Sequence, residues 1–245
     1  GNNNLLMKKG TLFLLPTPIS TDSPELVLPA GYLDIVNSIE VFITENIRTT
    51  RRFLRSIGFQ KDFDGIPYHL LNKHTSTEEI SSFLDQAMKG SATGLFSEAG
   101  MPCIADPGAK IVKMAHEKDL DVVPVNGPSS IMLALAASGL NGQQFAFHGY
   151  LPVQQSERTK RLKSLEGEAI KRDQTQIFIE APYRNNQMIS AITQSCKPET
   201  LLCIASEINS RQEFIKTWPV KTWREKKINL HKKNTIFLLY KETAG

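Results

Sequence analysis

The sequence predicts two α/β domains, the first with a mostly parallel sheet and the second with a mixed sheet. Its 245 residues suit two medium domains better than one. Through the first half, short β-rich runs alternate with helix-like stretches, which favours parallel pairing. Near the end, apolar runs follow one another over short connections, which favours antiparallel pairing. We place the boundary at the Asn126-Gly127-Pro128 turn, which gives domains of residues 10–126 and 127–245.

The first predicted domain follows the order β-α-β-α. Residues 11–15 (TLFLL) form a continuous apolar run that ends at Pro16-Thr17-Pro18, which is the pattern of a buried strand. The other predicted strands are residues 40–44, 93–96 and 121–125. Helical patterns cover residues 47–57, 76–89 and 111–117. The second of these helices has Glu78 and Glu79 in its first turn, where acidic residues are favourable.

The second predicted domain opens with a helix rich in small residues at 129–138. Predicted strands follow at residues 145–150, 176–180 and 201–206, with helices at 154–166 and 185–194. The last two apolar runs, 212–217 and 235–241, have the short connections expected of antiparallel strands.

The composition narrows the class of protein. Hydrophobic residues make up 40% and charged residues 22%, which is typical of globular chains, and no apolar run approaches the roughly 20 residues that span a bilayer. Residues 1–9 lack the apolar stretch of a signal peptide, so we expect a cytoplasmic protein without a membrane partner. Three cysteines without Cys-x-x-Cys spacing predict core thiols and no metal site. The net charge of +4 permits an anionic partner without requiring one.

The most informative loop is residues 96–108 (FSEAGMPCIADPG), which follows a predicted strand end. It is poor in side chains, and Gly100 lets backbone groups approach a flat ligand closely. Asp106 can cap the next helix, with Pro107 in its first turn. The loop lacks Gly-x-Gly-x-x-Gly spacing and gives no support to a dinucleotide fold. On its own it fits a structural turn at least as well as a ligand loop.

A second loop of similar character spans residues 123–130 (VPVNGPSS). Gly127-Pro128 forms a turn, and Ser129 and Ser130 open a helix whose free N–H groups can hold a carboxylate or a ligand hydroxyl. A capped packing helix explains this segment equally well. Two such loops, each after a strand, favour a ligand site.

Four arginines predict a basic face on the helix at residues 47–57. Their spacing is i, i+3, i+4 and i+7, which puts them on one helical face. They are Arg48, Arg51, Arg52 and Arg55. Such a stripe repels itself unless it meets anions, and the phosphates of RNA would serve. A solvated basic face is the other interpretation.

A second basic region covers residues 211–233. Trp218 and Trp223 lie among its lysines and arginines, where they can stack on bases or pack against the sheet. This region adds a second place at which RNA can bind.

Five segments, in order, resemble the tetrapyrrole-methylase superfamily. They are LPTPI at 15–19, ENIRTT at 45–50, SEAGMPCIADPG at 97–108, VPVNGPSS at 123–130 and HGYLP at 148–152. Within it, the chain is most similar to the RsmI-type enzymes, which methylate a ribose 2′-hydroxyl of a cytidine in small-subunit ribosomal RNA. The resemblance runs from about Gly10 to Lys241.

The resemblance implies a two-domain methylase fold, a homodimer, and S-adenosylmethionine bound in a cleft between the domains. It also implies small-subunit ribosomal RNA as substrate, either free or in the assembled subunit. The resemblance also implies which residues contact the cofactor, many of them through backbone atoms. Carried over by motif, they are Pro16, Ser97, Glu98, Ala99, Gly100, Ile104, Ala105, Ser129, Ser130, Tyr150 and Leu151.

The chain departs from the RsmI-type pattern at several places. Where those enzymes usually read EDTR this chain has Glu45-Asn46-Ile47-Arg48, and where they read SDAGTP residues 97–102 are SEAGMP. RsmI-type enzymes usually have Gly-Asn after PTPI, where this chain has Ser20-Thr21. They usually have Gly-Glu before the last strand, where this chain has Lys233-Asn234. The changes include acids on the expected substrate side, so the resemblance implies methyl transfer more firmly than it implies a cytidine target.

Methyl transfer to a ribose hydroxyl needs alignment of the reacting atoms and help with a proton. Glu45 and Glu98 are the candidate acid/base groups, although each could equally be a solvated or capping carboxylate. Arg48 would orient a phosphate or the ribose, and Glu180 is a third acid/base candidate. Two alternatives stay open: a tetrapyrrole methyltransferase of cobalamin or sirohaem synthesis, and a non-catalytic protein that binds the cofactor and RNA.

Overall fold

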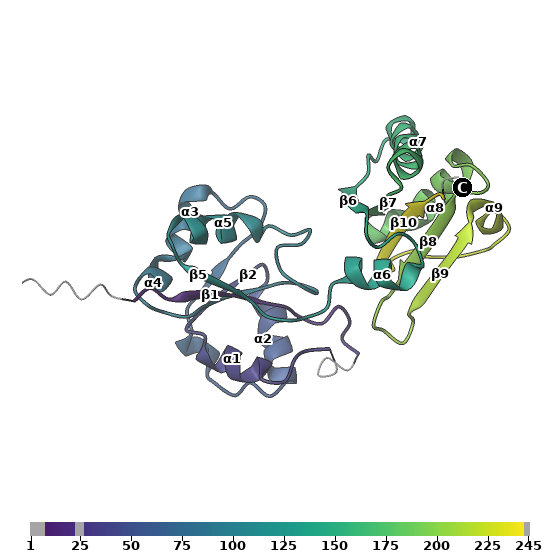
Figure 1. Ribbon diagram of the computed structural model, residues 1–245. Coiled ribbons are helices and arrows are strands. Elements are labelled where there is room, and N and C mark those ends of the chain that lie inside the picture. Colours follow the sequence, from purple (N-terminus) through teal and green to yellow (C-terminus); the bar gives the residue numbers. More distant parts are fainter. Residues whose placement is uncertain (1–7, 23–26, 243–245) are drawn as a thin grey trace, which may run out of the picture. The chain divides into compact units, whose positions relative to one another are not determined.

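The chain forms two compact units, residues 1–129 and 130–245. A computed structural model describes residues 8–22 and 27–242 (Figure 1). The expected boundary at 126/127 lies in the loop that precedes the first helix of the second unit. Residues 1–7, which belong to the segment discussed above as lacking a signal peptide, lie outside the described part.

The first unit is built on a parallel sheet of five strands in the order β3-β2-β4-β1-β5. These are β1 (Thr11–Leu15), β2 (Val41–Thr44), β3 (Tyr68–Leu70), β4 (Thr93–Phe96) and β5 (Asp121–Pro124). The predicted parallel sheet is thereby confirmed. The short edge strand β3 was not expected, because two of its three residues are exposed and it lacks an apolar run.

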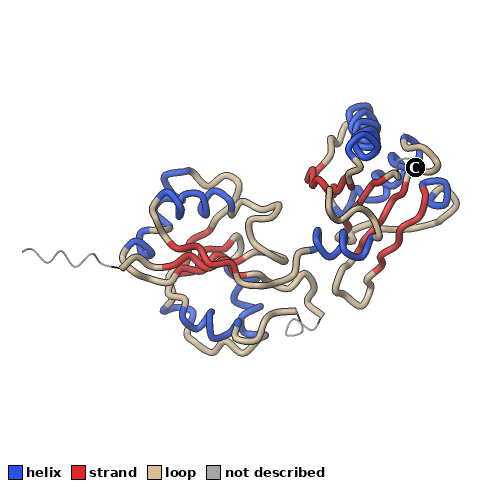
Figure 2. Tube along the Cα trace, viewed as in Figure 1, coloured by secondary structure: helices blue, strands red, loops and turns tan. Residues whose placement is uncertain are grey.

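Helices cover both faces of this sheet, with α3 and α5 on one side and α1 and α2 on the other (Figures 1 and 2). They are α1 (Tyr32–Ser38), α2 (Ile47–Ser56), α3 (Thr77–Phe83), α4 (Asp85–Met88) and α5 (Ala109–Glu117), with a short 3-10 turn η2 (Phe63–Gly65). Strand β1 shows why both faces need a cover. Leu12 packs into the cluster under α3 and α5, whereas Leu15 packs into the one under α1 and α2. Strands buried on both faces read as continuous apolar runs.

The second unit has a mixed sheet in the order β6-β7-β10-β8-β9. Its strands are β6 (Phe145–Tyr150), β7 (Thr175–Ile179), β8 (Leu201–Ser206), β9 (Phe214–Pro219) and β10 (Thr235–Tyr240). Only β6 and β7 pair in parallel; the remaining neighbours are antiparallel. The predicted antiparallel pairing near the end of the chain is confirmed.

Helix α6 (Ser130–Ser138) packs on one face of the second sheet, and α7 (Gln155–Arg172), α8 (Asn185–Ser195) and the short α9 (Val220–Trp223) pack on the other. A 3-10 turn, η3 (Pro182–Arg184), precedes α8. Ile131 of α6 joins one apolar cluster, and Leu162 of α7 joins the other together with Met188 of α8. Trp223 is buried, and its indole N–H donates to the carbonyl of Leu202 at 2.8 Å, so this tryptophan is a core residue.

Among the described residues, no helix is both long enough and apolar enough to cross a lipid bilayer.

Candidate functional site

The carboxyl edge of the parallel sheet carries most of the residues predicted from the sequence. Chain segments leave β1 at Pro16, β2 at Glu45, β4 at Ser97 and β5 at Val125. Because β2, β4, β1 and β5 are consecutive in the sheet, all four of these strand ends lie next to one another. In open parallel sheets, ligands bind in the crevice outside this edge.

A hydrogen-bond network ties the loop after β1 to the loop after β4. The backbone N–H of Thr17 donates to the carbonyl of Gly100 at 3.1 Å, and the N–H of Gly100 donates back to the carbonyl of Thr17 at 2.9 Å. The buried hydroxyl of Ser97 accepts from the N–H of Thr17 at 3.2 Å and donates to the carbonyl of Gly100. The Ser97 hydroxyl is therefore occupied within the loops, and its backbone is the part that a ligand can use.

Two glycines allow the three loops to touch. Gly100 has φ +72°, and a Cβ placed there would lie 3.0 Å from the carbonyl oxygen of Pro128, which already accepts from the N–H of Met101 at 2.9 Å. A Cβ on Gly127 would lie 2.2 Å from Cγ of Pro16. A side chain at either position would separate the loops after β1, β4 and β5.

The loop after β4 holds two non-glycine residues in the left-handed region. Cys103 has φ 71° and Ala105 has φ 60°, a conformation that costs roughly 1–2 kcal/mol per residue. The carboxylate of Asp106 stabilises it by accepting from the N–H of Cys103 and of Gly108, each at 2.8 Å. The expectation that Asp106 caps the next helix is wrong, because α5 begins only at Ala109 and has no side-chain cap. Backbone strain of this kind gathers at binding sites.

Two candidate carboxylates meet at this edge. Glu98 follows β4, Glu45 follows β2, and both line a small hollow together with Asp106. Burial raises the pKa of Glu98, and the charge of Glu45 raises it further, while hydrogen bonds from Thr49 and from the backbone of Asn46 oppose part of the rise. The hydroxyl of Thr49 donates to the Glu98 carboxylate at 3.3–3.4 Å. A carboxyl group that binds its proton more tightly is suited to acid/base work near neutral pH.

A hollow of about 490 Å³ opens between α2 and the loops that follow β1 and β4. Thr17, Ser97 and Glu98 line it from the loops, and Arg52 and Phe53 line it from α2. Its volume lies within the roughly 300–1,000 Å³ that is usual for small-molecule sites. Glu98 lines this hollow and the smaller one beside Glu45, so it faces both.

The arginines of α2 have different surroundings. Arg55 donates to the carbonyls of Phe59 at 2.6 Å and Lys61 at 2.8 Å, and its guanidinium lies 4.1 Å from the ring centroid of Phe63. Arg51 lies over the rings of Phe63 and Tyr68 at 5.3 and 5.2 Å. Arg48 and Arg52 have exposed side chains, and Arg52 lines the hollow. Two of the four arginines thus bind the chain that follows α2.

This difference predicts unequal effects of substitution on stability. We expect Arg55→Ala to lower the free energy of unfolding by about 1 to 2 kcal/mol, because two carbonyls lose a charged donor. Arg52→Ala should change it by no more than about 0.5 kcal/mol, because Arg52 makes no hydrogen bond or ring contact within the described part of the chain. Urea denaturation of both variants measures the difference. Equal losses would contradict the assignment of Arg55 to the fold.

Three residues of the predicted cofactor set belong to the second unit. Ser130 is the first residue of α6, and Tyr150, at the end of β6, is 65% exposed. Leu151 is only 4% exposed and lies in the apolar core, so only its backbone is open to a ligand.

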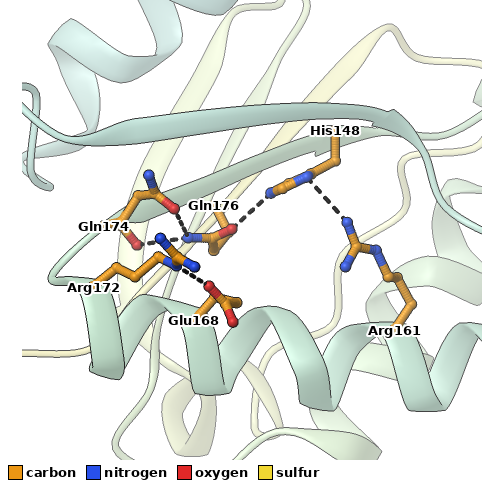
Figure 3. Close-up of polar contacts among 6 residues, drawn as sticks. All are labelled: His148, Arg161, Glu168, Arg172, Gln174 and Gln176. Atoms are coloured by element: carbon orange, nitrogen blue, oxygen red, sulfur yellow. Dashed lines mark hydrogen bonds and ion pairs between the residues drawn. The ribbon is translucent and has the colours of Figure 1, made fainter.

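A polar cluster around His148 holds β6 in place two residues before its end at Tyr150 (Figure 3). His148 Nε2 lies 2.6 Å from Oε1 of the buried Gln176, and the guanidinium of Arg161 lies 3.2 Å from His148 Nδ1. Arg161 donates through N–H, so His148 accepts at Nδ1 and donates at Nε2, which defines its tautomer. Gly149 follows with φ +66°, and the register of β6 against β7 shifts between Phe147 and Tyr150.

Glu180, the third acid/base candidate, is engaged within the second unit. Its Oε1 accepts from the N–H of Ala181 at 2.7 Å and from Nε of Arg184 at 3.1 Å, and its side chain is fully buried. These contacts give Glu180 a role in holding the turn after β7.

The family model for tetrapyrrole (corrin/porphyrin) methylases matches residues 26–223. A Bacillus subtilis protein named ribosomal RNA small subunit methyltransferase I is 32% identical over 207 residues, which is 84% of this chain and 67% of that protein. The chain belongs to the tetrapyrrole methylase family. A protein of the same name from Pseudomonas aeruginosa is 29% identical over 87% of this methylase and 72% of its own length. Another, from Buchnera aphidicola subsp. Schizaphis graminum, is 29% identical over 96% of this methylase and 80% of its own length.

Solved structures of tetrapyrrole methylases share the fold. The crystal structure of the methyltransferase CobJ superposes with a TM-score of 0.61 at 14% identity, covering 95% of this chain and 93% of that one. Cobalt precorrin-4 methyltransferase CbiF gives a TM-score of 0.58 at 14% identity, with 94% of each chain covered. These structures confirm the expected methylase fold. The family model and the curated relatives confirm that the chain is a methyltransferase.

The geometry explains one departure from the RsmI-type pattern. Asn46, where those enzymes usually carry an acid, caps α2 by accepting from the N–H groups of Arg48 at 3.0 Å and Thr49 at 3.3 Å. Asparagine and aspartate are equally good at this position of a helix. The replacement therefore keeps the start of α2 in place, and with it Thr49, which holds Glu98.

Some residues at this edge were missed by the sequence analysis. Thr17 bridges the loops after β1 and β4, and its position between two prolines at a strand end was the available signal. Tyr32 of α1 donates its hydroxyl to the carbonyl of Pro16 at 2.6 Å, and burial raises its pKa. No local pattern connects Tyr32 to Pro16, because the contact depends on how α1 packs under β1.

The sequence predicts thiols in or near the core, and the three cysteines of this methylase lie there. Cys196 and Cys203 are buried and Cys103 is half-buried. Burial raises the pKa of Cys103 and of Cys196 to about 12. Across residues 8–22 and 27–242, no group of three or more His, Cys, Asp or Glu side chains is placed to hold a metal ion.

Proposed function

We propose that this methylase transfers a methyl group from S-adenosylmethionine to a ribose 2′-hydroxyl of small-subunit ribosomal RNA. The observation that carries the proposal is Glu98. It lies beside the 490 Å³ hollow, has a raised pKa, and sits in a loop joined to β1 through Thr17 and Gly100. The curated relatives at about 30% identity, all named for ribosomal RNA of the small subunit, supply the substrate class.

The loops after β1, β4 and β5 fit the cofactor. The loops after β1 and β4 line a hollow of suitable size. Gly100 and Gly127 hold the backbone of all three loops close together, and the side chain of Ile104 is 49% exposed. We propose Pro16, residues 97–100, Ile104, Ala105 and Ser129 as the cofactor residues of the first unit, and Ser130, Tyr150 and Leu151 as those of the second. When bound, S-adenosylmethionine supplies a methyl group that is already activated on a sulfonium.

The chain itself has to align the hydroxyl and move its proton. Glu98 would accept the proton of the ribose hydroxyl, and Glu45 would tune Glu98 by its charge. Arg48 and Arg52 extend from α2 beside the hollow, where they would hold the phosphates next to the target ribose. Alignment of this kind can contribute about 7–11 kcal/mol to the reaction. We also propose that the enzyme is a cytoplasmic homodimer.

The test uses S-adenosylmethionine with a tritiated methyl group. We expect incorporation into small-subunit ribosomal RNA, either free or in the assembled subunit, and mass mapping should place it on a ribose. Incorporation into a porphyrinogen but into no RNA would replace the proposal with a tetrapyrrole activity. Cofactor binding by calorimetry without incorporation into any RNA would indicate a non-catalytic binder. Arg48→Glu should weaken RNA binding and leave cofactor binding unchanged, because Arg48 is exposed and does not line the hollow.

A further inference from the structure

We infer that the second unit carries a surface for an RNA strand along α8, anchored by Arg158 at the start of α7. The inference rests on the proposed function, because it assumes that the substrate is RNA. It concerns a surface separate from the edge of the parallel sheet described above.

Arg158 is an unusual arginine. It is only 7% exposed, and its Nε is buried without a hydrogen-bond partner. Within the described part of the chain, none of the ion pairs involves Arg158. A buried polar atom without a partner costs free energy, and an external anion bound by the guanidinium would offset that cost. Arg158 lines a hollow of about 520 Å³ between α7 and α8.

The first turn of α7 adds to the attraction for anions at the same place. Gln154, the residue that caps α7, makes no side-chain hydrogen bond to the helix, and Gln155 and Thr159 of α7 line the hollow with Arg158. Free N–H groups at the start of a long helix favour phosphate groups. The nearest acid in the sequence, Glu157, is paired with Lys160 at 3.7 Å and does not line the hollow.

A second hollow of about 490 Å³ continues from the first along α8. Asn186 and Ser190, four residues apart on one face of α8, line both hollows. Lys226 and Lys227, both exposed, line the far side. The lining of the two hollows contains no aspartate or glutamate.

Arg224 also lines the second hollow, but it has a structural task. Its Nε donates to the carbonyl of Thr193 at 2.8 Å and its Nη2 to that of Cys196 at 2.9 Å, at the end of α8. Asn186 joins α8 to the loop before β10 by donating to Asn229 at 2.9 Å and accepting from the N–H of Leu230 at 2.8 Å. The two hollows together form a groove along α8, and these hydrogen bonds hold its walls in place. Cations at both ends and amides and hydroxyls between them suit the phosphates and sugars of a single strand.

The main test compares two double variants of the full chain. Lys226→Gln with Lys227→Gln removes two cations from the groove, and Lys163→Gln with Lys171→Gln removes two exposed cations of α7 that line neither hollow. Binding of a short fluorescein-labelled oligouridylate is measured by anisotropy over a range of salt concentrations. The groove variant should bind about tenfold more weakly, with a salt slope flatter by about 1.4, or about 0.7 per lost contact. An RNA affinity and a salt slope of the groove variant equal to those of the parent would overturn the inference.

Arg158→Met provides an independent test, because methionine keeps an unbranched side chain as far as the position of Nε and removes the charged end of the guanidinium. We expect weaker binding of the oligouridylate and a melting temperature no lower than that of the parent, since an unpartnered buried charge is removed. A lower melting temperature with unchanged RNA affinity would mean that Arg158 only supports the fold, and would overturn its role as the anchor.

The inference and the proposed function fail in different ways. Methyl transfer to ribosomal RNA with the same KM for parent and groove variant would reject the groove and keep the function. Oligouridylate binding that depends on Lys226 and Lys227, without methyl transfer to any RNA, would keep the groove and reject the function. If the groove were instead an interface between two copies of the chain, its variant would change sedimentation and leave RNA affinity unchanged, which also overturns the inference.

Discussion

Gly100→Val should weaken the binding of S-adenosylmethionine by at least about a hundredfold. The left-handed backbone at Gly100 is strained for a β-branched residue, and the new Cβ would lie 3.0 Å from the carbonyl oxygen of Pro128. That oxygen belongs to the chain after β5, so the two loops would have to separate. The paired hydrogen bonds between Gly100 and Thr17 would be disturbed as well. Isothermal titration calorimetry measures the loss.

Gly139→Val is the matched control for this experiment. Gly139 has φ +73°, against +72° for Gly100, and a Cβ there meets nothing within 4 Å. Both variants should lose stability through backbone strain, by about 1–3 kcal/mol, but only Gly100→Val should lose the cofactor. A folded Gly100→Val protein that binds the cofactor like the parent would place the site elsewhere.

Glu98→Gln should lower kcat for methyl transfer to RNA by about 10²- to 10⁴-fold, which is the usual contribution of a positioned acid/base group. Glutamine has the same shape and can still accept from Thr49, so the KM and the affinity for the cofactor should change little. Single-turnover kinetics with saturating cofactor separates these quantities. A kcat within about twofold of the parent would remove Glu98 from proton transfer and leave alignment as the main contribution of the protein.

The same pair of carboxylates predicts two effects of pH. Glu45→Gln removes a negative charge that raises the pKa of Glu98, so the acidic limb of the rate profile should move to lower pH. In the parent, Glu98 binds its proton more tightly in the folded than in the unfolded chain. The resulting stability is present below the ordinary pKa of 4.5 and is lost as pH rises through the folded value. The stability of Glu98→Gln relative to the parent should therefore increase as pH rises above 4.5, as measured by urea denaturation at a series of pH values.

The sequence was sufficient for elements with a strong apolar pattern. β1, β4, β6 and β8 have the predicted bounds. β1 and β8 are apolar runs with a clear stop, and β4 ends at the start of a glycine-containing loop. Elements with weak local signals were missed or changed. The helix α1 has seven residues and begins after Gly31, which makes no side-chain cap. The predicted helix at 76–89 is two helices that meet at Leu84.

The candidate site divides in the same way. Glu45, Glu98 and Gly100 could be chosen from sequence because strand ends and glycine turns are local patterns. The partners of the arginines in α2 could not, because the spacing of Arg51 and Arg55 reports only which face of the helix they share. The spacing does not show that the chain after α2 folds back, so that the ring of Phe63 and two backbone carbonyls contact Arg55. Tertiary contacts between segments far apart in sequence decide such roles.

The place of β10 in its sheet affects how the protein is made. The first unit needs only residues up to Pro124 to complete its sheet, and its last strand, β5, is added at an edge. In the second unit, β10 inserts between β7 and β8, so the centre of the sheet is missing until residue 240 has been synthesised. Until then β7 and β8 present unpaired apolar edges, which favour misassembly. A nascent chain arrested before residue 235 would thus carry a folded first half and an aggregation-prone second half.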